Sequence, residues 1–229
     1  MKKHKIKGPY EAFIKRLLDI IISLAVMILF CWLYAIIAIL VRVKLGSPVI
    51  FAQNRPGIID PKTGKEKIFK LYKFRSMIDK RDENGELLPG KDRMTPFGTK
   101  LRATSLDELP EIWNIFKGDM SLIGPRPLAV IYLPYYTDEE RVRHQVRPGL
   151  TGLAQVSGRN NLTWEEKFAY DVEYANNITF KTDLKIIIMT IKAVLSHEGI
   201  GQGEQSPENF NEYRQRQIDE RKQGEGNEA

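Results

Sequence analysis

Residues 101–128 of the chain read LRATSLDELPEIWNIFKGDMSLIGPRPL. Two adjacent carboxylates, Asp107 and Glu108, stand between Arg102 and Arg126, and a Gly-Pro-Arg-Pro sequence stiffens the chain around the second arginine. A site that handles a phosphate ester through a divalent cation needs such groups. One carboxylate can attack phosphorus or bind the metal, and the guanidinium groups can neutralise phosphate oxygens.

The same residues also fit a purely structural role. Ser105 and Glu108 have the spacing of a capping box, in which the serine is the N-cap and the glutamate bonds back to its amide. Pro110 opposes this interpretation, because its ring would clash within such a helix and the helix more naturally starts at the proline. The local pattern leaves both interpretations open. The apolar residues recur at helical spacing, as one buried stripe would: Leu106, Leu109, Trp113 and Phe116.

Composition narrows the classes of protein. The chain has 229 residues, enough for one cored domain with an appendage, and 35 basic against 29 acidic residues give a formal net charge of +6. This moderate bias is compatible with an anionic membrane surface, phosphorylated substrates or nucleic acid. One cysteine and three histidines exclude a disulfide framework and argue against a zinc site. The basic residues are not interleaved with aromatic residues as a groove for single strands requires, so nucleic acid is not an expected partner.

An apolar run at residues 17–43, uncharged from 20 to 41, is long enough to cross a bilayer as a helix. It is too long for the apolar core of a signal peptide, and a buried helix of a soluble protein is the alternative. Basic residues lie on both sides of the run, so the positive-inside rule predicts no orientation. A re-entrant helix that enters and leaves the same leaflet is one solution, although no Pro or Gly marks a break. Asp19 is expected at the membrane interface.

The middle of the chain predicts a β-hairpin. Residues 49–53 and 68–74 have strand composition, with turns expected at 54–57 and 60–64. Lys73 and Arg75 share one face of the second strand, where they could meet a phosphate or simply be solvated. Residues 79–98 are polar and interrupted by Gly and Pro, which predicts a mobile surface loop.

Three glycines lie among arginines in RPGLTGLAQVSGRNN at residues 147–161. Gly149, Gly152 and Gly158 are expected to let the backbone approach a ligand closely, and Arg159 adds a fixed cation. Residues 164–174 are a helix candidate that carries Asp171.

Residues 183–195 are strongly amphipathic and are expected to pack on the core, with the bilayer interface as the alternative. From residue 199 the composition becomes polar, which predicts a disordered end or a poorly anchored helix. We therefore divide the chain into a basic N-terminus with a membrane helix (1–47), a catalytic domain (48–198) and a polar C-terminal tail (199–229).

Four sequences in this order, VIFAQNRPG, LYKFRSM, SLDELPEIWNIFKGDMSLIGPRPL and RPGLTGLAQVSGRN, resemble the bacterial sugar transferase family. More narrowly, they resemble its small monotopic phosphoglycosyl transferases, over about residues 13–196. The resemblance implies an α+β fold: a membrane helix that is re-entrant, then a small mixed catalytic domain with a short β-hairpin and amphipathic interfacial helices. Members of this family commonly carry a Ser-Pro break in that membrane helix, where this chain reads Phe30-Cys31-Trp32.

The resemblance also implies a reaction. Such proteins transfer a sugar 1-phosphate from a UDP-sugar to a polyprenyl phosphate, usually undecaprenyl phosphate, and release UMP. They require Mg²⁺ and work among membrane lipids at the cytoplasmic face of the bacterial inner (plasma) membrane, as a first membrane step of glycoconjugate synthesis. By motif, Asp107 is the expected nucleophile and Glu108 the expected catalytic Mg²⁺ ligand. The expected substrate-binding residues are Lys73, Arg102, Arg126, Arg159, Asp171 and Asp183.

Two other functions are compatible with the residues. The same overall reaction could proceed by direct transfer in a ternary complex, without an aspartyl intermediate. Alternatively, a non-catalytic membrane-anchored scaffold could use its basic residues on acidic lipids, at about 1 kcal/mol per cation. The identity of the UDP-sugar and the oligomeric state, including a homodimer, stay open at this point.

Overall fold

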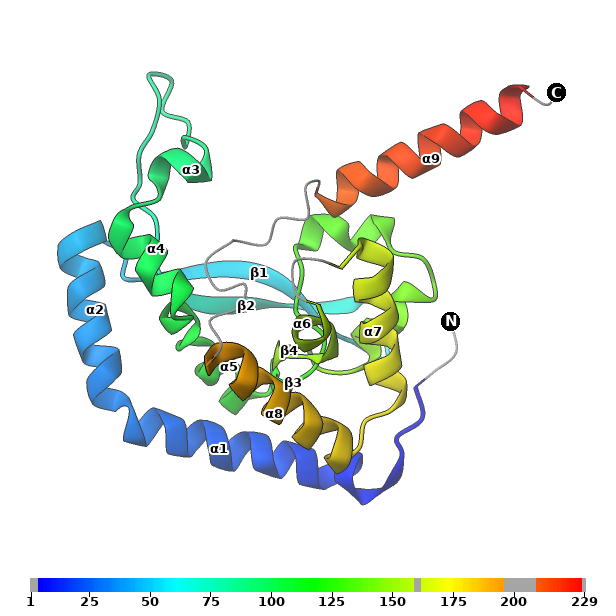
Figure 1. Ribbon diagram of the computed structural model, residues 1–229, viewed down its shortest axis with the longest axis horizontal. Coiled ribbons are helices and arrows are strands. Elements are labelled where there is room, and N and C mark those ends of the chain that lie inside the picture. The colour runs from blue at the N-terminus through cyan, green and yellow to red at the C-terminus, as the bar shows by residue number, and fades with distance from the viewer. Residues whose placement is uncertain (1–3, 159–161, 196–208, 228–229) are drawn as a thin grey trace.

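The computed structural model describes residues 4–158, 162–195 and 209–227. A long antiparallel hairpin crosses the middle of the molecule, and helices lie around it (Figure 1). A second, smaller sheet pairs two short strands in parallel. This mixture of helices with a two-stranded hairpin confirms the expected α+β class.

The N-terminal apolar run forms a bent pair of helices along one edge of the molecule (Figure 1). A π-helical turn, η1 (Tyr10–Ile14), leads into α1 (Lys15–Leu29), and α2 (Cys31–Leu45) follows at an angle of 64°. No single described helix is long and apolar enough to cross a membrane, whereas the bent pair reaches that length and composition together.

The bend lies at Phe30, without the proline that commonly marks it in the family. The backbone leaves helical geometry there, with φ −109° and ψ 14°, yet the Phe30 N–H still donates to the Val26 carbonyl at 3.0 Å. The two halves pack on different apolar clusters. Each half thus makes its own contacts on either side of the bend. The end of α1 packs on Phe69, Leu71, Ile112, Ile115 and Met120, and α2 packs on Phe74 and Leu101.

Asp19 of α1 is buried within the protein, and its expected place at the membrane interface stays a prediction. Its Oδ1 accepts hydrogen bonds from the Leu122 N–H at 2.9 Å and the Ser121 hydroxyl at 3.1 Å. The carboxylate therefore ties α1 to the small parallel sheet. Protein groups thus supply hydrogen bonds to this buried carboxylate.

The hairpin consists of β1 (Ile50–Ile59) and β2 (Glu66–Phe74), so both expected strands are confirmed and are longer than predicted. The turn expected at 54–57 is wrong, because those residues continue β1. A register shift between Pro56 and Ile59 accommodates the proline within the strand. In this register Phe51 lies opposite Lys73, which places Lys73 at the end of β2 nearest α2.

Residues 79–98 are more ordered than predicted. They contain α3 (Gly90–Arg93) and the first residues of α4 (Pro96–Ala103), whose N-cap Thr95 accepts from the Gly98 N–H at 3.0 Å. After α4 come a single 3₁₀ turn, η2 (Leu106–Glu108), and α5 (Glu111–Lys117). The helix start predicted at Pro110 is thus correct to within one residue.

The small sheet pairs β3 (Ser121–Ile123) with β4 (Gly149–Thr151). A Cβ at Gly149 would lie 2.0 Å from the Gly124 nitrogen, and one at Gly152 would lie 2.2 Å from the Gly124 oxygen. At Gly149 and Gly152 the close approach is thus to another segment of the chain, and their expected approach to a ligand stays a prediction. They allow two segments of the chain to approach each other.

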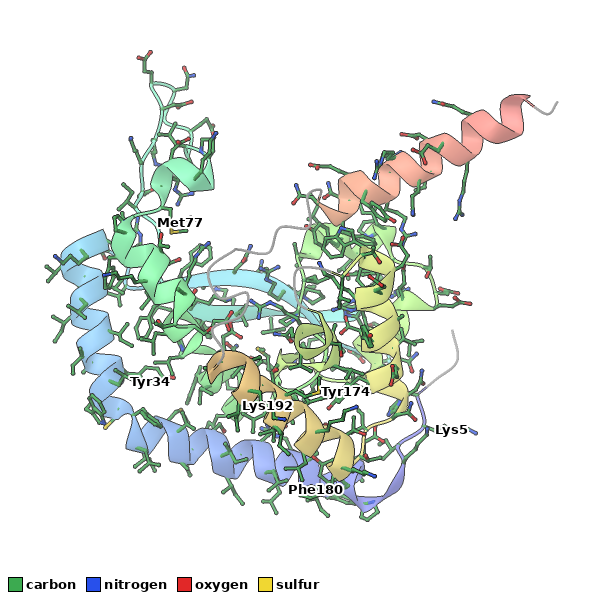
Figure 2. All side chains as sticks on the ribbon, viewed as in Figure 1. Lys5, Tyr34, Met77, Tyr174, Phe180 and Lys192 are labelled. Carbon is green, nitrogen blue, oxygen red and sulfur yellow. The ribbon has the colours of Figure 1, made fainter. Side chains whose placement is uncertain are left out.

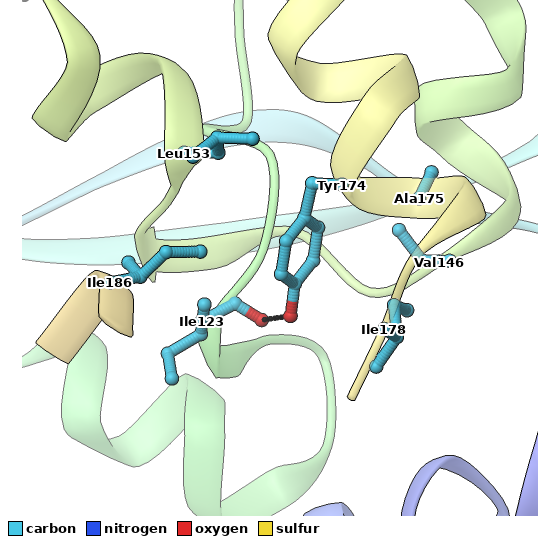
Figure 3. Packing of buried hydrophobic residues seen from close by; sticks show 7 residues of the cluster. All are labelled: Ile123, Val146, Leu153, Tyr174, Ala175, Ile178 and Ile186. Carbon is cyan, nitrogen blue, oxygen red and sulfur yellow. Dashed lines mark hydrogen bonds between the residues drawn. The ribbon is translucent and has the colours of Figure 1, made fainter. Parts of the chain in front are cut away.

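The main core lies between this sheet and the helices that follow β4, up to residue 195. Its cluster comprises Ile123, Val146, Leu153, Tyr174, Ala175, Ile178 and Ile186, and the Tyr174 hydroxyl donates to the Ile123 carbonyl at 3.1 Å (Figure 3). The expected helix at 164–174 is confirmed as α7 and begins with a capping box between Thr163 and Glu166. The remaining elements here are η3 (Val130–Tyr135), η4 (Glu140–Gln145), α6 (Leu153–Ser157), α7 (Trp164–Asn176) and α8 (Phe180–Leu195).

The apolar stripe of α8 faces outward, so core packing of that stripe is wrong. Asp183, Ile186 and Thr190, at helical spacing, form the inner face, and Thr190 bonds Thr151 of β4 at 2.8 Å. The exposed stripe consists of Leu184, Ile187, Ile188, Ile191 and Val194. In α1 the arrangement is the same: Asp19 and Ser23 are buried while many apolar side chains project from the outer edge (Figure 2). Two helices thus turn polar groups inward and apolar groups outward.

The C-terminal helix α9 (Phe210–Asn227) projects away from the body (Figure 1). Phe210 is fully buried and anchors it on an aromatic cluster. The expected poor anchoring is therefore wrong for the start of this helix, where Tyr213 also donates to Glu165 at 2.7 Å. Residues 199–208 lie outside the described part of the chain. The cluster around Phe210 contains Tyr136, Trp164 and Phe168.

Candidate active site

Asp107 and Glu108 lie in η2, the short turn between α4 and α5. The preceding Ser105 has a left-handed backbone, with φ 54°, and its side chain makes no capping hydrogen bond. The capping-box interpretation of this stretch is therefore wrong. The turn is closed instead by the Glu108 N–H, which donates to the Ser105 carbonyl at 3.1 Å, and Tyr34 of α2 donates its hydroxyl to the Leu109 carbonyl.

Two cations converge on one oxygen of Glu108. Lys73 Nζ from β2 and Arg126 Nη2 from the segment after β3 each lie 2.8 Å from Oε1. Burial alone would raise the pKa of Glu108, but the charges and hydrogen bonds of Arg126 and Lys73 outweigh it and lower that pKa to about 2. Glu108 is thus a carboxylate at every physiological pH. Its second oxygen accepts no hydrogen bond from any described residue.

Asp107 is only 7% exposed, and within the described residues neither of its oxygens accepts a hydrogen bond. Burial raises its pKa, against the opposing influence of Lys73, Arg102 and Arg126. A carboxylate without hydrogen bonds keeps its lone pairs available, and surrounding cations draw an anionic substrate toward it. These are the properties that a nucleophile for a phosphate ester needs.

Arg102 lies on α4 and is exposed, with its Nε 2.9 Å from the Ser76 hydroxyl. Its charge lowers the pKa of Asp107 without a direct contact. The structure thus brings Lys73, Arg102 and Arg126 around the carboxylate pair, as the motifs predict. Lys73 and Arg126 have side chains 22% and 27% exposed, so the cluster is reached from the surface.

Glu111 is a member of this cluster that sequence reasoning missed. Its side chain is 3% exposed, and its Oε1 lies 3.1 Å from Lys73 Nζ. Burial raises its pKa to about 7, with the negative charge of Glu108 adding to the rise and Lys73 opposing it. In the sequence Glu111 follows Glu108 by three residues, at the start of α5, but its burial beside Lys73 is not visible there.

Asp171 and Asp183 have internal partners. Asp171 of α7 accepts from Arg143 Nε at 2.9 Å, and Asp183 of α8 accepts from Lys15 Nζ at 2.7 Å and the Tyr174 hydroxyl at 2.8 Å. Both side chains are buried, and neither contacts Asp107 or Glu108 within the described residues. Their expected contact with substrate stays a prediction. Arg159 lies outside the described residues, so its expected role also stays a prediction.

The described residues contain no group of three or more His, Cys, Asp or Glu side chains that could hold a metal ion. Mg²⁺ in phosphate-transfer sites is commonly held by one or two carboxylates together with substrate phosphates and water, so it needs no such cage. A surface hollow of about 520 Å³ lies elsewhere, beside α9, and none of the cluster residues lines it.

The chain is similar to a family of known proteins. A model of the bacterial sugar transferase family matches residues 10–197. An uncharacterized sugar transferase, EpsL of Bacillus subtilis, is 48% identical over 82% of this chain and 91% of its own length. The UDP-glucose:undecaprenyl-phosphate glucose-1-phosphate transferase of Caulobacter vibrioides is 35% identical over 80% of this chain and 70% of its own length.

A larger relative is the undecaprenyl-phosphate galactose phosphotransferase of Salmonella typhimurium, which is 36% identical over 82% of this chain but only 41% of its own length. The shared part therefore spans nearly the whole of some relatives and less than half of others. The match to the family covers the bent helix pair, the hairpin and the cluster around Asp107. The chain belongs to the bacterial sugar transferase family.

Proposed function

We propose that this protein transfers a sugar 1-phosphate from a UDP-sugar to a polyprenyl phosphate, undecaprenyl phosphate in particular, and releases UMP. The observation that carries this proposal is the cluster itself. Lys73 and Arg126 share one oxygen of Glu108, and beside it stands Asp107, buried and without hydrogen bonds from the described residues. The names of the relatives from Caulobacter and Salmonella support the substrate classes.

The first step has an electrostatic obstacle, because an anionic carboxylate attacks an anionic diphosphate. Lys73, Arg102 and Arg126 supply three positive charges close to Asp107. Such preorganised cations stabilise the charge that develops on the phosphoryl oxygens. The cations therefore make the attack by Asp107 feasible.

In the proposed mechanism an Asp107 oxygen forms a bond to the phosphorus that carries the sugar. The bond from that phosphorus to the bridging oxygen breaks, and UMP leaves with the oxygen and its electron pair. An oxygen of the polyprenyl phosphate then attacks the same phosphorus, and the acyl-phosphate bond breaks to regenerate the Asp107 carboxylate. The covalent intermediate divides one difficult transfer into two.

Mg²⁺ fits this site through Glu108. The oxygen of Glu108 that faces neither cation accepts no hydrogen bond from the described residues, and an ionised carboxylate is a ligand that Mg²⁺ prefers. When bound, the ion would neutralise phosphate charge as a Lewis acid. Within the chain, Glu108 would then hold the ion while Lys73 and Arg126 keep its side chain oriented.

We also propose that α1, α2 and α8 lie in or on the inner membrane, with the bent pair re-entrant and the cluster at the cytoplasmic face. The support is the outward apolar stripe of α8 together with the outward apolar side chains of α1. Exposure of such an apolar surface to water is unfavourable, whereas contact with lipid is not. A site held beside the lipid surface meets a polyprenyl phosphate without extracting it, which raises the effective concentration of the acceptor.

The test is UMP release by the purified full chain with Mg²⁺, undecaprenyl phosphate and a panel of UDP-sugars. Asp107→Asn should lower turnover by about a thousandfold or more, because the amide is not a nucleophile. Glu66→Gln is the control: Glu66 forms an ion pair with Arg141 outside the cluster, and its variant should keep turnover within about twofold.

Incubation with UDP-sugar but without lipid acceptor should leave a phospho-sugar adduct on Asp107, detectable by intact-mass spectrometry. Stoichiometric UMP release only in the presence of the acceptor, with no adduct, would indicate direct transfer in a ternary complex. A wild-type protein that releases no UMP from any UDP-sugar would leave the scaffold function as the better account.

A further inference from the structure

Arg143, a residue of η4 to which the motifs assign no role, has its guanidinium group buried at 3% exposure. Its Nε and Nη2 lie 2.9 and 2.8 Å from Asp171 Oδ2, and Nη1 donates to the Tyr136 hydroxyl at 3.3 Å. The guanidinium carbon also lies 5.6 Å from the ring centroids of both Tyr136 and Phe168. The group is thus fixed by an ion pair and by two aromatic rings.

The same guanidinium reaches the active site through the backbone. Its Nη2 donates to the carbonyl of Arg126 at 2.7 Å, and the Nη2 of Arg126 in turn donates to Glu108 at 2.8 Å. A continuous line of contacts therefore runs from Asp171 through Arg143 and Arg126 to Glu108. It connects α7, η4, the segment after β3, and η2.

The segment that carries Arg126 contains two prolines. The arginine is flanked by Pro125 and Pro127, which have no backbone N–H to donate. The Pro125 carbonyl accepts from the Gly149 N–H at 3.0 Å, and the Arg126 carbonyl accepts from Arg143. Since a guanidinium 1 Å out of place can weaken catalysis strongly, this second anchor bears on where the Arg126 side chain points.

We propose that Arg143, held by Asp171, is a positioning residue: it fixes the Arg126 carbonyl and thereby directs the Arg126 guanidinium onto Glu108. This inference rests on the proposed function, because Arg126 is expected there to neutralise substrate phosphate. It also gives Asp171 a different task from the one its motif implies. Asp171 acts on the site through Arg143.

Burying an arginine and an aspartate costs several kcal/mol of desolvation, which their mutual attraction roughly offsets, so the pair is weak evidence of stabilisation by itself. A neighbouring arginine of the same element offers the comparison. Arg141 pairs with Glu66 of β2 at 2.8 Å and has no contact with Arg126 among the described residues. Arg141→Lys is therefore the matched control for Arg143→Lys.

A lysine at position 143 keeps the positive charge for Asp171 but lacks the planar fork that bonds Asp171, Tyr136 and Arg126 together. We expect Arg143→Lys to lower kcat/KM for the UDP-sugar by about tenfold to a hundredfold, with a raised KM as well as a lowered kcat. Arg141→Lys should stay within about twofold of wild type. A variant that is merely partly unfolded would show a lower apparent kcat with an unchanged KM, and that result would overturn the proposal.

A double-mutant cycle separates positioning from general destabilisation. In an Arg126→Lys background the fork at position 126 is gone, so adding Arg143→Lys should cost less than about threefold further. Effects that multiply in the double variant would overturn the proposal, as would an Arg143→Lys protein with wild-type kinetics. Each of these outcomes presupposes an active wild-type enzyme. Absence of UMP release by the wild type is the separate result that rejects the proposed function.

Discussion

Oε1 of Glu111 lies 3.1 Å from the ammonium nitrogen of Lys73, and the same ammonium lies 2.8 Å from Oε1 of Glu108. Lys73 therefore stands between two carboxylates that compete for one positive charge. Glu108 also has Arg126, whereas Lys73 is the only ion-pair partner of Glu111 among the described residues. This inequality explains why the pKa of Glu108 is lowered to about 2 while burial raises that of Glu111 to about 7.

The raised pKa of Glu111 predicts a pH-dependent stability. Its value in the folded protein, about 7, exceeds the ordinary 4.5, so the neutral acid is favoured by folding. The stability that this contributes is complete below pH 4.5 and is lost as the pH rises through 7. Glu111→Gln lacks this dependence. Relative to the variant, the wild type should lose up to about 3 kcal/mol between pH 5 and pH 8, measured as the difference in melting temperature.

Glu139→Gln, a substitution at an exposed position, is the control for this comparison. The melting temperature of this variant should follow that of the wild type from pH 5 to pH 8. If Glu111→Gln and the wild type lose stability in parallel from pH 5 to pH 8, the Glu111 carboxyl does not titrate in this interval. Its pairing with Lys73 would then be stronger than the 3.1 Å contact indicates.

Glu108→Gln tests the proposed metal ligand. The substitution keeps the size of the side chain but replaces a carboxylate by an amide, a poorer ligand for Mg²⁺. We expect the Mg²⁺ concentration that half-saturates UMP release to rise by about tenfold or more. The measurement is a Mg²⁺ titration at saturating UDP-sugar, with Glu66→Gln as the control. An unchanged half-saturating concentration, whatever the loss of kcat, would assign the metal to other groups.

The sequence predicted the neighbours of the carboxylate pair but not every member of the cluster. The motifs around Lys73 and Arg126 are separated by about fifty residues, and the fold brings both onto Glu108. Glu111 was missed because its significance comes from burial, which a single sequence does not display. The strand contact of Gly149 and Gly152 was not predicted for a similar reason: a missing Cβ indicates close approach but not whether a ligand or another strand approaches.

For the helices, too, the sequence predicts local structure but not the tertiary contacts. The pattern of residues 183–195 correctly identified one apolar stripe, but periodicity does not tell which medium the stripe faces. In α8 the face that packs on the protein carries Asp183 and Thr190, whose partners come from distant segments. The burial of Asp19 was likewise not predicted, because its partner Leu122 is far along the chain.

The lone cysteine provides a test of the membrane arrangement. Cys31 follows the bend and is exposed on the protein surface. If the bend lies in the bilayer, a water-soluble maleimide should leave Cys31 unlabelled in intact membranes and label it after denaturation in SDS. In a Cys31→Ser background, Glu139→Cys is the accessible control, because Glu139 is exposed on the catalytic domain.

The same background distinguishes a re-entrant pair from a spanning helix. Lys5 precedes the pair and Thr63 follows it in the hairpin turn, and both are exposed. A re-entrant pair predicts that Lys5→Cys and Thr63→Cys are labelled from the same side, in inside-out vesicles and not in intact spheroplasts. Labelling of the two positions from opposite sides would show that the helix spans, and the 64° bend would then be accommodated within a crossing helix.

The contact between Gly124 and Gly149 predicts that position 149 tolerates no side chain. A Cβ at Gly149 would lie 2.0 Å from the Gly124 nitrogen and 2.6 Å from its Cα, and both are backbone atoms that cannot rotate away. Gly149→Ala should therefore destabilise the protein by about 3 kcal/mol or more. Gly90→Ala is the control, since the nearest atom to its Cβ, at 3.2 Å, is the terminal methyl of Met77.

The measurement is the melting temperature of both variants, which for a chain of this size should fall by roughly 6–12 °C in Gly149→Ala and little in Gly90→Ala. Because the Gly149 N–H also holds the Pro125 carbonyl, a Gly149→Ala protein that still folds should lose UMP release more steeply than its stability predicts. Equal melting temperatures for the two variants would mean that β3 and β4 can separate without cost. The anchoring of Arg126 through Gly149 would then have no structural basis.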